Sequence, residues 1–193
     1  MVVIPNWSKI NKENRIADLK NKTVLAVGRY DYLKGFDLLI KAWKLVHNIH
    51  PDWKLRLVGD ECEKYQIQID EEGLSSCIET SGRTLHINEE YQNCSIYCLS
   101  SRKEAFGLVI IETKSFGIPC VAFDCPYGPR EVINNGIDGL LVENGNCTEL
   151  ANNLIYLMNH QEEIKKMGYM AKMDYQKRFT PNVSIQKWIE ILR

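Results

Sequence analysis

Short apolar runs alternate with longer stretches of helical periodicity along the whole chain. The run at 23–28 (TVLAVG) is rich in β-branched residues and ends in glycine, which predicts a buried strand. Further strands are predicted at 53–59, 77–80, 95–99, 119–123 and 139–142. Because these runs are apolar on both sides instead of alternating, they are typical of a parallel sheet that helices cover on both faces.

Helical patterns fill the intervals between these strands. Apolar side chains at helical spacing predict a helix over 36–50, which Pro51 ends, with Leu45 and Ile49 among its apolar positions. Further helices are predicted at 61–72, 88–93, 106–116, 147–159, 161–178 and 182–192. We expect Asn88 to cap the helix at 88–93, and Leu108 to face inward from the helix at 106–116.

Strands separated by helices imply parallel pairing through right-handed crossovers. The predicted fold class is therefore α/β, a doubly wound Rossmann-like parallel sheet of about six strands. Residues 22–180 would form this domain. Residues 1–21 are less regular and read as a linker and lead-in, and residues 181–193 form a separate C-terminal helix after the break at Pro181.

The length and the net charge of the chain limit the classes of function that it could have. The 193 residues suit one domain, and the net charge of −1 creates no overall field that would recruit nucleic acid. No apolar run approaches 18 residues, so no transmembrane helix is expected. Seven cysteines lie scattered without CxxC spacing, several within apolar runs, which indicates reduced thiols, a cytoplasmic protein and no metal site.

Candidate chemistry lies in the loops after the strands, because ligands of open parallel sheets bind at the carboxyl ends of the strands. The loop from Gly28 to Gly35 carries Arg29 and Lys34 and leads into a helix N-terminus. Such a loop can hold a diphosphate by charge and by backbone N–H groups. The same residues would also suit a plain surface turn.

The segment EAFGLVIIE follows the strand at 95–99 and places Glu104 eight residues before Glu112, about two helical turns. Carboxylates accept hydrogen bonds from sugar or ribose hydroxyls, and the amides from Phe106 to Val109 at a helix start suit a phosphate. This is the pattern of a nucleotide-sugar site. The alternative for Glu112 is a solvated helix residue.

Two further loops could contribute to a site. Gly82 and Arg83 follow the strand at 77–80 and could hold a nucleobase by main-chain groups and stacking, or form a bare turn. The loop at 124–131 (DCPYGPRE) is stiffened by two prolines and a glycine, so it is either a site wall or a rigid connection.

These motifs, in this order, resemble glycosyltransferase family 4, of the GT-B fold, over nearly the whole chain. The matching pieces are VGR with KG at 27–35, LVG at 57–59, GR at 82–83, EAFGLVIIE at 104–112, GIPCV at 117–121 and NGIDGLLV at 135–142. The stretch FDCPYGPRE at 123–131 is similar to a subgroup of bacterial enzymes of surface-polysaccharide or lipopolysaccharide assembly, many of which transfer galactose or N-acetylgalactosamine from UDP-sugars.

The resemblance implies a retaining transferase that needs no metal and no cofactor besides its nucleotide-sugar donor. Arg29, Lys34 and Glu104 would be the catalytic set, the two cations neutralising the diphosphate and Glu104 binding the donor sugar. Glu112 would bind the ribose. The remaining donor-binding positions would be Gly28, Gly82, Arg83, Phe106, Gly107, Leu108 and Val109.

Family members have two such domains, and this chain resembles only the C-terminal one. The N-terminal domain would supply the site for a glycan or lipid-linked acceptor, so we expect this chain to bind a donor without completing a transfer. The segment at 2–6 resembles the interdomain link, and the apolar side of the last helix, with Val183, Trp188, Ile189 and Leu192, would be exposed. The whole enzyme would work in the cytoplasm, at the inner face of the membrane if its acceptor is a lipid.

Two other functions stay open at this point. A UDP-sugar epimerase with the same fold would share a donor half, although it lacks the EAFGLVIIE pattern in this form. A non-catalytic nucleotide-sugar-binding module would use the same scaffold, but Arg29, Lys34, Glu104 and Glu112 are all present, which argues against a decayed site.

Overall fold

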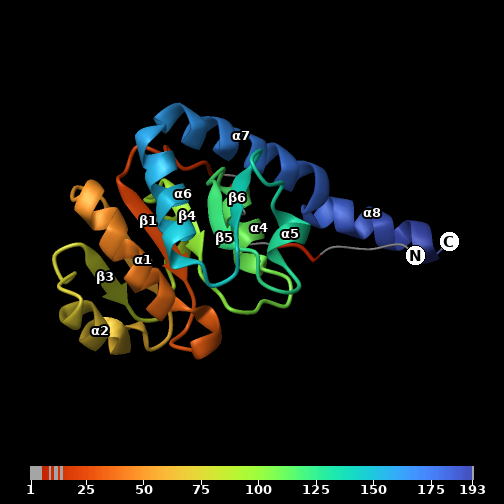
Figure 1. Ribbon diagram of the computed structural model, residues 1–193. Helices are drawn as coiled ribbons and strands as arrows, with labels where there is room; N and C mark the ends of the chain where they lie inside the picture. Colours follow the sequence, from red (N-terminus) through yellow and green to blue (C-terminus); the bar gives the residue numbers. More distant parts are fainter. Residues whose placement is uncertain (1–5, 9, 11–12, 14, 193) are drawn as a thin grey trace.

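Six parallel strands form one sheet in the computed structural model, which describes residues 6–8, 10, 13 and 15–192. The order across the sheet is β3-β2-β1-β4-β5-β6 (Figure 1), which confirms the predicted doubly wound parallel sheet of about six strands. The strands are β1 (Thr23–Val27), β2 (Lys54–Val58), β3 (Ile78–Ser81), β4 (Ile96–Leu99), β5 (Cys120–Phe123) and β6 (Gly139–Val142).

Helices cover both faces of the sheet. The helices are α1 (Phe36–Ile49), α2 (Gln66–Glu71), α3 (Ile87–Gln92), α4 (Leu108–Ser115), α5 (Pro129–Val132), α6 (Cys147–Asn159), α7 (Gln161–Arg178) and α8 (Pro181–Leu192). α1 and α6 pack together in front of the sheet, whereas α4 lies behind it and contacts α7 (Figure 1). Short 3-10 turns at Tyr32–Lys34 and Cys62–Tyr65, and the one-turn helix α5, are too short to leave a periodic signal in the sequence.

The core lies between these layers and is continuous from β3 to β6. All residues of β4 and β5 are buried, and the largest buried side chains include Trp43, Phe116 and Phe123. Each such side chain contributes roughly 1.5–3 kcal/mol when removed from water. The buried sheet is therefore the rigid frame from which the loops at the carboxyl ends of the strands project.

Some predictions about single positions were wrong. His86, not Asn88, is the N-cap of α3, and the Oδ1 of Asn88 is buried without a hydrogen-bond partner among the described residues. Leu45 and Ile49 on α1 are exposed, because α6 covers only one side of that helix. α4 begins at Leu108 instead of residue 106, and Leu108 is 45% exposed in its first turn and does not face inward.

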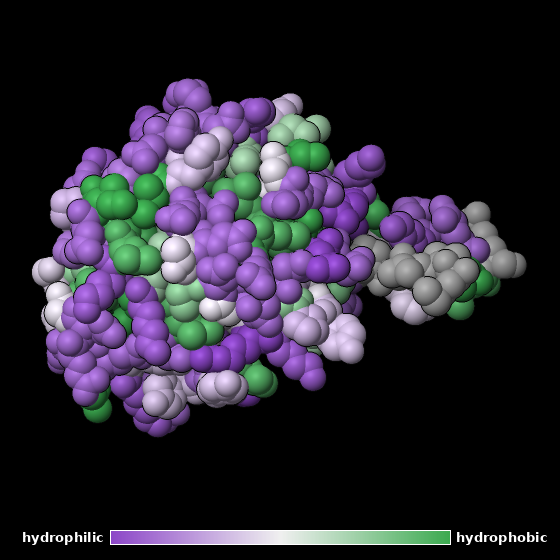
Figure 2. All heavy atoms as spheres, viewed as in Figure 1, coloured by the Kyte–Doolittle hydropathy of each residue, from purple (hydrophilic) through white to green (hydrophobic). Residues whose placement is uncertain are grey.

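The terminal segments predicted as separate from the domain can be compared with the structure where it describes them. Of the predicted linker and lead-in, residues 1–5 lie outside the described part of the chain, and 15–20 form no helix or strand there. α8 projects from the domain (Figures 1 and 2), with Trp188, Ile189 and Leu192 exposed as predicted and Val183 half-buried. Within the part of the chain that the structure describes, no helix combines the length and the hydropathy needed to cross a bilayer.

Candidate active site

The neighbouring strands β1 and β4 each lead into a loop that contributes one charged side chain to a common site. Lys34 ends the 3-10 turn after β1, and Glu104 lies in the loop after β4. The Lys34 Nζ is 2.6 Å from the Glu104 Oε1, and the Ser101 hydroxyl donates a 2.7 Å hydrogen bond to the same oxygen. These strands lie where the strand order reverses, which is the usual ligand position in such sheets.

Lys34 reaches Glu104 because its side chain passes over Gly28, which has no side chain to block it. A Cβ on Gly28 would lie 3.1 Å from the Lys34 side-chain carbons, so the lysine stem crosses the glycine in close contact. The Asp31 carboxylate accepts the N–H of Leu33 at 2.8 Å and shapes the turn that carries Lys34. Gly28 and Lys34, predicted as site residues, are therefore brought together as one unit.

Arg102 connects the loop after β4 to the segment after β1. The sequence did not predict this role. Its guanidinium donates to both carboxylate oxygens of Asp37, at 2.8 and 2.7 Å, and to the carbonyl of Tyr32 at 2.7 Å. Its backbone N–H also donates to the carbonyl of Leu33. Its position in the loop after a buried strand was the available signal, but the sequence could not show that Asp37 lies opposite.

A cavity of about 250 Å³ lies beside the ion pair. Its lining comprises Asn6, Lys34, Glu104, Ala105, Phe106, Gly107, Leu108 and Val109. The first N–H groups of an α-helix have no intrahelical partner and form its positive end, and α4 begins at this cavity. With Lys34 on one side and the start of α4 on the other, the cavity suits a phosphate or diphosphate.

Glu112 lies one turn further along α4 and does not line this cavity. Its carboxylate accepts hydrogen bonds from the Tyr91 hydroxyl at 2.8 Å and from the Ser8 hydroxyl at 3.4 Å. Burial raises the pKa of Glu112, and the two hydroxyls oppose that shift. Glu112 is thus a partly buried and oriented carboxylate, which excludes the solvated helix residue that the sequence left open.

The other predicted site residues lie outside the cavity. Arg29 is 69% exposed and pairs with Asp31 at 2.9 Å, and it does not line the cavity. Arg83 is exposed at the end of β3, beyond β2 on the outer side of the sheet, and Gly82 beside it faces the Glu63 carboxylate. Arg29, Gly82 and Arg83 could contact a ligand only where it extends beyond the cavity.

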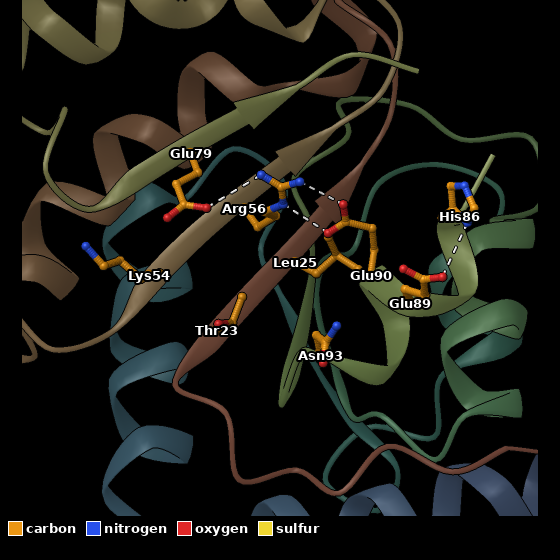
Figure 3. A pocket seen from close by; sticks show the side chains of 9 residues that line it. All are labelled: Thr23, Leu25, Lys54, Arg56, Glu79, His86, Glu89, Glu90 and Asn93. Atoms are coloured by element: carbon orange, nitrogen blue, oxygen red, sulfur yellow. Dashed lines mark hydrogen bonds and ion pairs between the residues drawn. The ribbon is translucent and has the colours of Figure 1, made fainter. Parts of the chain in front are cut away.

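A larger cavity, of about 320 Å³, lies over the face of β1, β2 and β3 beside α3 (Figure 3). In Figure 3 the Arg56 guanidinium points between Glu79 and Glu90, with two hydrogen bonds to Glu90 of 2.9 and 2.8 Å. His86 likewise pairs with Glu89 at 3.3 Å. The lining of this cavity has three carboxylates against two cations, Lys54 and Arg56, so it suits a phosphate less than the cavity at the strand ends does.

The cysteines offer no reactive thiolate among the described residues. All seven are free thiols, and six are buried. Burial raises the pKa of Cys62 to about 12 and that of Cys98 further still. No group of three or more His, Cys, Asp or Glu side chains gathers as metal ligands in the described residues.

Residues 8–174 match the family described as glycosyl transferases group 1. An uncharacterized glycosyltransferase of Haemophilus influenzae is 33% identical over 192 residues, covering 98% of this chain and 53% of that protein. The amylovoran biosynthesis glycosyltransferase AmsD of Erwinia amylovora is 34% identical over 201 residues, covering 98% of this chain and 55% of that protein. The chain therefore spans about half the length of these relatives.

Solved structures that resemble this chain also match it over most of its length. A variant of Staphylococcus aureus TarM, in complex with fondaparinux, alpha-GlcNAc-glycerol and UDP, matches with a TM-score of 0.84 at 25% identity, covering 98% of this chain and 38% of that one. Anabaena HepE, in complex with UDP and glucose, matches with a TM-score of 0.80 at 27% identity, covering 89% and 48%. With its six-stranded parallel sheet and the match over residues 8–174, this chain belongs to the group 1 glycosyltransferases and has the Rossmann-like domain of the GT-B fold.

Proposed function

We propose that this chain is the donor-binding domain of a retaining transferase and binds a UDP-hexose or UDP-N-acetylhexosamine at the carboxyl ends of β1 and β4. The observation that carries the proposal is the cavity where the Lys34–Glu104 ion pair meets the start of α4. A cation and a helix N-terminus suit the diphosphate, and a carboxylate beside them suits sugar hydroxyls. Nucleoside-diphosphate sugars combine these two chemical features.

The proposed chemistry places the developing negative charge of the departing nucleotide on the Lys34 ammonium and the first amides of α4. Fixed donors aimed at a leaving phosphate stabilise the transition state without reorganisation, which is the role a metal ion has in other transferases. Reaction therefore needs no metal and no further cofactor. Glu104, oriented by Lys34 and Ser101, accepts hydrogen bonds from the donor sugar, and the acceptor attacks from the face on which the nucleotide leaves.

Glu112 and the more distant residues would bind the nucleoside. The Glu112 carboxylate has acceptor capacity beyond its bonds to Tyr91 and Ser8, and we assign it to the ribose hydroxyls. Arg29 can exchange its exposed bond to Asp31 for a diphosphate oxygen, because exposed ion pairs contribute little free energy. Gly82 and Arg83 would contact the base.

UDP is the proposed nucleotide because the HepE structure contains UDP and glucose. Within the group 1 enzymes, we place the chain in family 4. The names of other relatives include a poly(glycerol-phosphate) alpha-glucosyltransferase and a poly(ribitol-phosphate) alpha-N-acetylglucosaminyltransferase. Transfer of galactose or N-acetylgalactosamine is therefore one of several choices of hexose, and it stays a prediction.

A second domain would supply the larger part of the acceptor site, opposite this chain, since the relatives are about twice as long as this chain. The exposed apolar side of α8 would pack on that domain, which removes Trp188 and Leu192 from water. The name of one further relative, an exopolysaccharide phosphotransferase of Streptomyces coelicolor, supports a role in surface-polysaccharide assembly. A lipid-linked acceptor would place the reaction at the inner face of the membrane.

Calorimetric titration of this chain with UDP, ADP and GDP tests the proposal. We expect UDP to bind, and we expect Lys34→Ala and Glu112→Ala each to weaken it about tenfold or more, roughly 1.4 kcal/mol. Lys44→Ala is the matched control, because Lys44 forms an ion pair with Glu72 on the surface of α1 and α2. Absence of UDP binding, or an equal loss in Lys44→Ala, would refute the assignment.

A further inference from the structure

The loop after β5, residues 124–130, packs directly against the residues that would bind the donor sugar. A Cβ on Gly128 would lie 3.0 Å from the backbone carbon of Phe106 and 3.3 Å from the Cβ of Glu104. Cys125 is buried near Glu104, and burial together with that carboxylate raises the pKa of its thiol to about 11. This loop therefore borders the sugar end of the proposed donor site, not the nucleotide end.

The loop is also held in one shape. The Arg130 guanidinium binds the Asp124 carboxylate through two nitrogens, one of them at 3.0 Å, so the two ends of the loop are tied together. Pro126 and Pro129 restrict the backbone between those ends. A loop fixed in this way can present a side chain in a defined direction.

The side chain that it presents is Tyr127. Its φ is +70°, one of three positive φ values among the described residues other than glycine, and its side chain is 73% exposed. The left-handed conformation is unfavourable for an aromatic residue and persists only where the surroundings impose it, which happens most often at functional sites. A glycine would fit this backbone without strain, so the aromatic residue at this position indicates a function for its ring.

Beside Tyr127 lies a cavity of about 500 Å³, lined by Asp124, Cys125, Pro126, Tyr127, Arg130 and Asn144. The single cation in this lining, Arg130, is matched by Asp124, so the cavity has no net positive charge to attract a phosphate. Its polar groups can bind hydroxyls, and the tyrosine ring offers an apolar face. Pyranose rings combine these two features, with C–H groups on their faces and hydroxyls around their edges.

We propose that Tyr127 is a stacking platform for the sugar ring of an uncharged carbohydrate acceptor, which occupies this cavity next to the donor sugar. The proposal rests on the donor site described above, because the acceptor must approach the carbon that leaves the nucleotide. The Asp124–Arg130 pair positions the platform, and the contact of Gly128 with Phe106 sets its distance from the donor sugar.

Ligand-observed NMR on this chain, saturated with UDP, tests the proposal. The probes are methyl β-D-glucopyranoside, methyl β-D-galactopyranoside and methyl α-D-N-acetylglucosaminide, with sn-glycerol 3-phosphate as a charged acceptor of another class. We expect at least one glycoside to bind. Tyr127→Phe should change the affinity for this glycoside by no more than about twofold, whereas Tyr127→Ala should lower it by about fivefold or more. Tyr169→Ala removes another exposed tyrosine, from α7, and should leave glycoside affinity unchanged.

UDP titration and thermal unfolding of each variant separate the possible failures. Tyr127→Gly is a second variant that the positive φ favours, so it should fold at least as stably as the parent and still lose glycoside binding. The proposal is overturned if no glycoside binds, if Tyr127→Ala and Tyr127→Gly keep glycoside binding, if Tyr127→Phe loses it as fully as Tyr127→Ala, or if only glycerol phosphate binds. If UDP itself does not bind, the donor-site assignment fails, and this proposal fails with it.

Discussion

The Glu112 carboxylate is enclosed by its own helix α4, by Tyr91 of α3 and by Ser8 of the segment before β1. Tyr91 is fully buried, so its hydroxyl has a fixed position and holds one carboxylate oxygen in place. Tyr97 of β4 is a further titratable group beside Glu112, and burial raises its pKa far above the range where it could ionise near neutral pH. Tyr91 is therefore a positioning residue for Glu112.

Replacing Tyr91 with phenylalanine should change the pH dependence of UDP binding. Ribose hydroxyls favour the ionised carboxylate, so affinity should fall as the pH drops through the pKa of Glu112 in the free chain, which burial raises above its usual value. Tyr91→Phe removes an opposing hydrogen bond and raises this pKa further. We expect the decline to begin at higher pH, with about 1 kcal/mol of affinity lost near neutrality.

Glu112→Gln supplies the control for this experiment, because the terminal phosphate of UDP also titrates, with a pKa of about 6. Calorimetric profiles of the parent chain, Tyr91→Phe and Glu112→Gln separate the two ionisations, since only the phosphate titrates in the Gln variant. A Tyr91→Phe profile that is weaker at every pH but unshifted would mean that Tyr91 has only a packing role.

At the scale of elements, the start of α4 decides the geometry of the proposed donor site. Gly107 precedes the helix with a φ of +80°, and a Cβ at this position would lie 2.9 Å from the Ile110 Cδ1. The helix has only eight residues, too few to be stable alone, so burial of Ile110 and Ile111 must hold it in place. The first amides of α4 consequently point where the core and Gly107 direct them.

Gly107→Ala should therefore affect stability and binding together. The left-handed backbone costs an alanine about 1–2 kcal/mol, so thermal unfolding should show a loss of that size. The contact with Ile110 should also shift the first turn, and we expect UDP affinity to fall by about tenfold, or 1.4 kcal/mol. Gly145→Ala is the matched control, because its φ is +83° with no atom within 4 Å of the added Cβ.

The control should lose a similar free energy of unfolding and bind UDP unchanged. Equal UDP affinity in the Gly107 variant and the parent would show that the start of α4 does not contact the nucleotide.

At the scale of the whole molecule, a buried ion network joins three parts of the fold. The Lys114 Nζ, on α4, lies 2.8 Å from Asp138 before β6 and 2.7 Å from Asp174 on α7. Lys114 and Asp138 are each 1% exposed. Arg178 adds a second cation to Asp174 at 2.6 Å. The network fixes α4, and thus the proposed donor site, to the C-terminal part of the domain.

Lys114→Met should lower the free energy of unfolding by about 3–5 kcal/mol, because it leaves the buried Asp138 carboxylate without its cation, whereas Asp174 keeps Arg178. Urea unfolding measures this loss. The control variant Lys166→Met removes an exposed ion pair with Glu163, so its free energy of unfolding should differ from that of the parent by less than about 1 kcal/mol. A loss for Lys114→Met no larger than that of the control would contradict the role of the network.

The pH dependence supplies a second test of the same network. Burial raises the pKa of Asp174, but hydrogen bonds from Arg178 and Lys114 outweigh it and hold the pKa below its usual value. A lowered pKa contributes stability that is lost as the pH falls through it. Without Lys114 part of that contribution is absent, so the variant should lose less stability on acidification than the parent does.

The sequence by itself determined the sheet, the order of its elements and the edge where a ligand would bind. Apolar runs and helical periods are local signals, and the rules for parallel connections convert them into one topology. They also placed Lys34 and Glu104 after strands that prove to be neighbours. The carboxyl edge of the sheet and its two main charged residues could therefore be predicted without coordinates, but their pairing could not.

Only the tertiary structure decided which side chains meet at that edge. Tyr91 and Glu112 are 21 residues apart, and Lys34 and Glu104 are 70 apart, so their contacts depend on how α3, α4 and the loops pack. The strained backbone of Tyr127 leaves no periodic signal either. The physical reason is that hydrophobic burial follows from the local pattern, whereas hydrogen bonds and ion pairs depend on distances of a few ångströms between segments that only the packed core brings together.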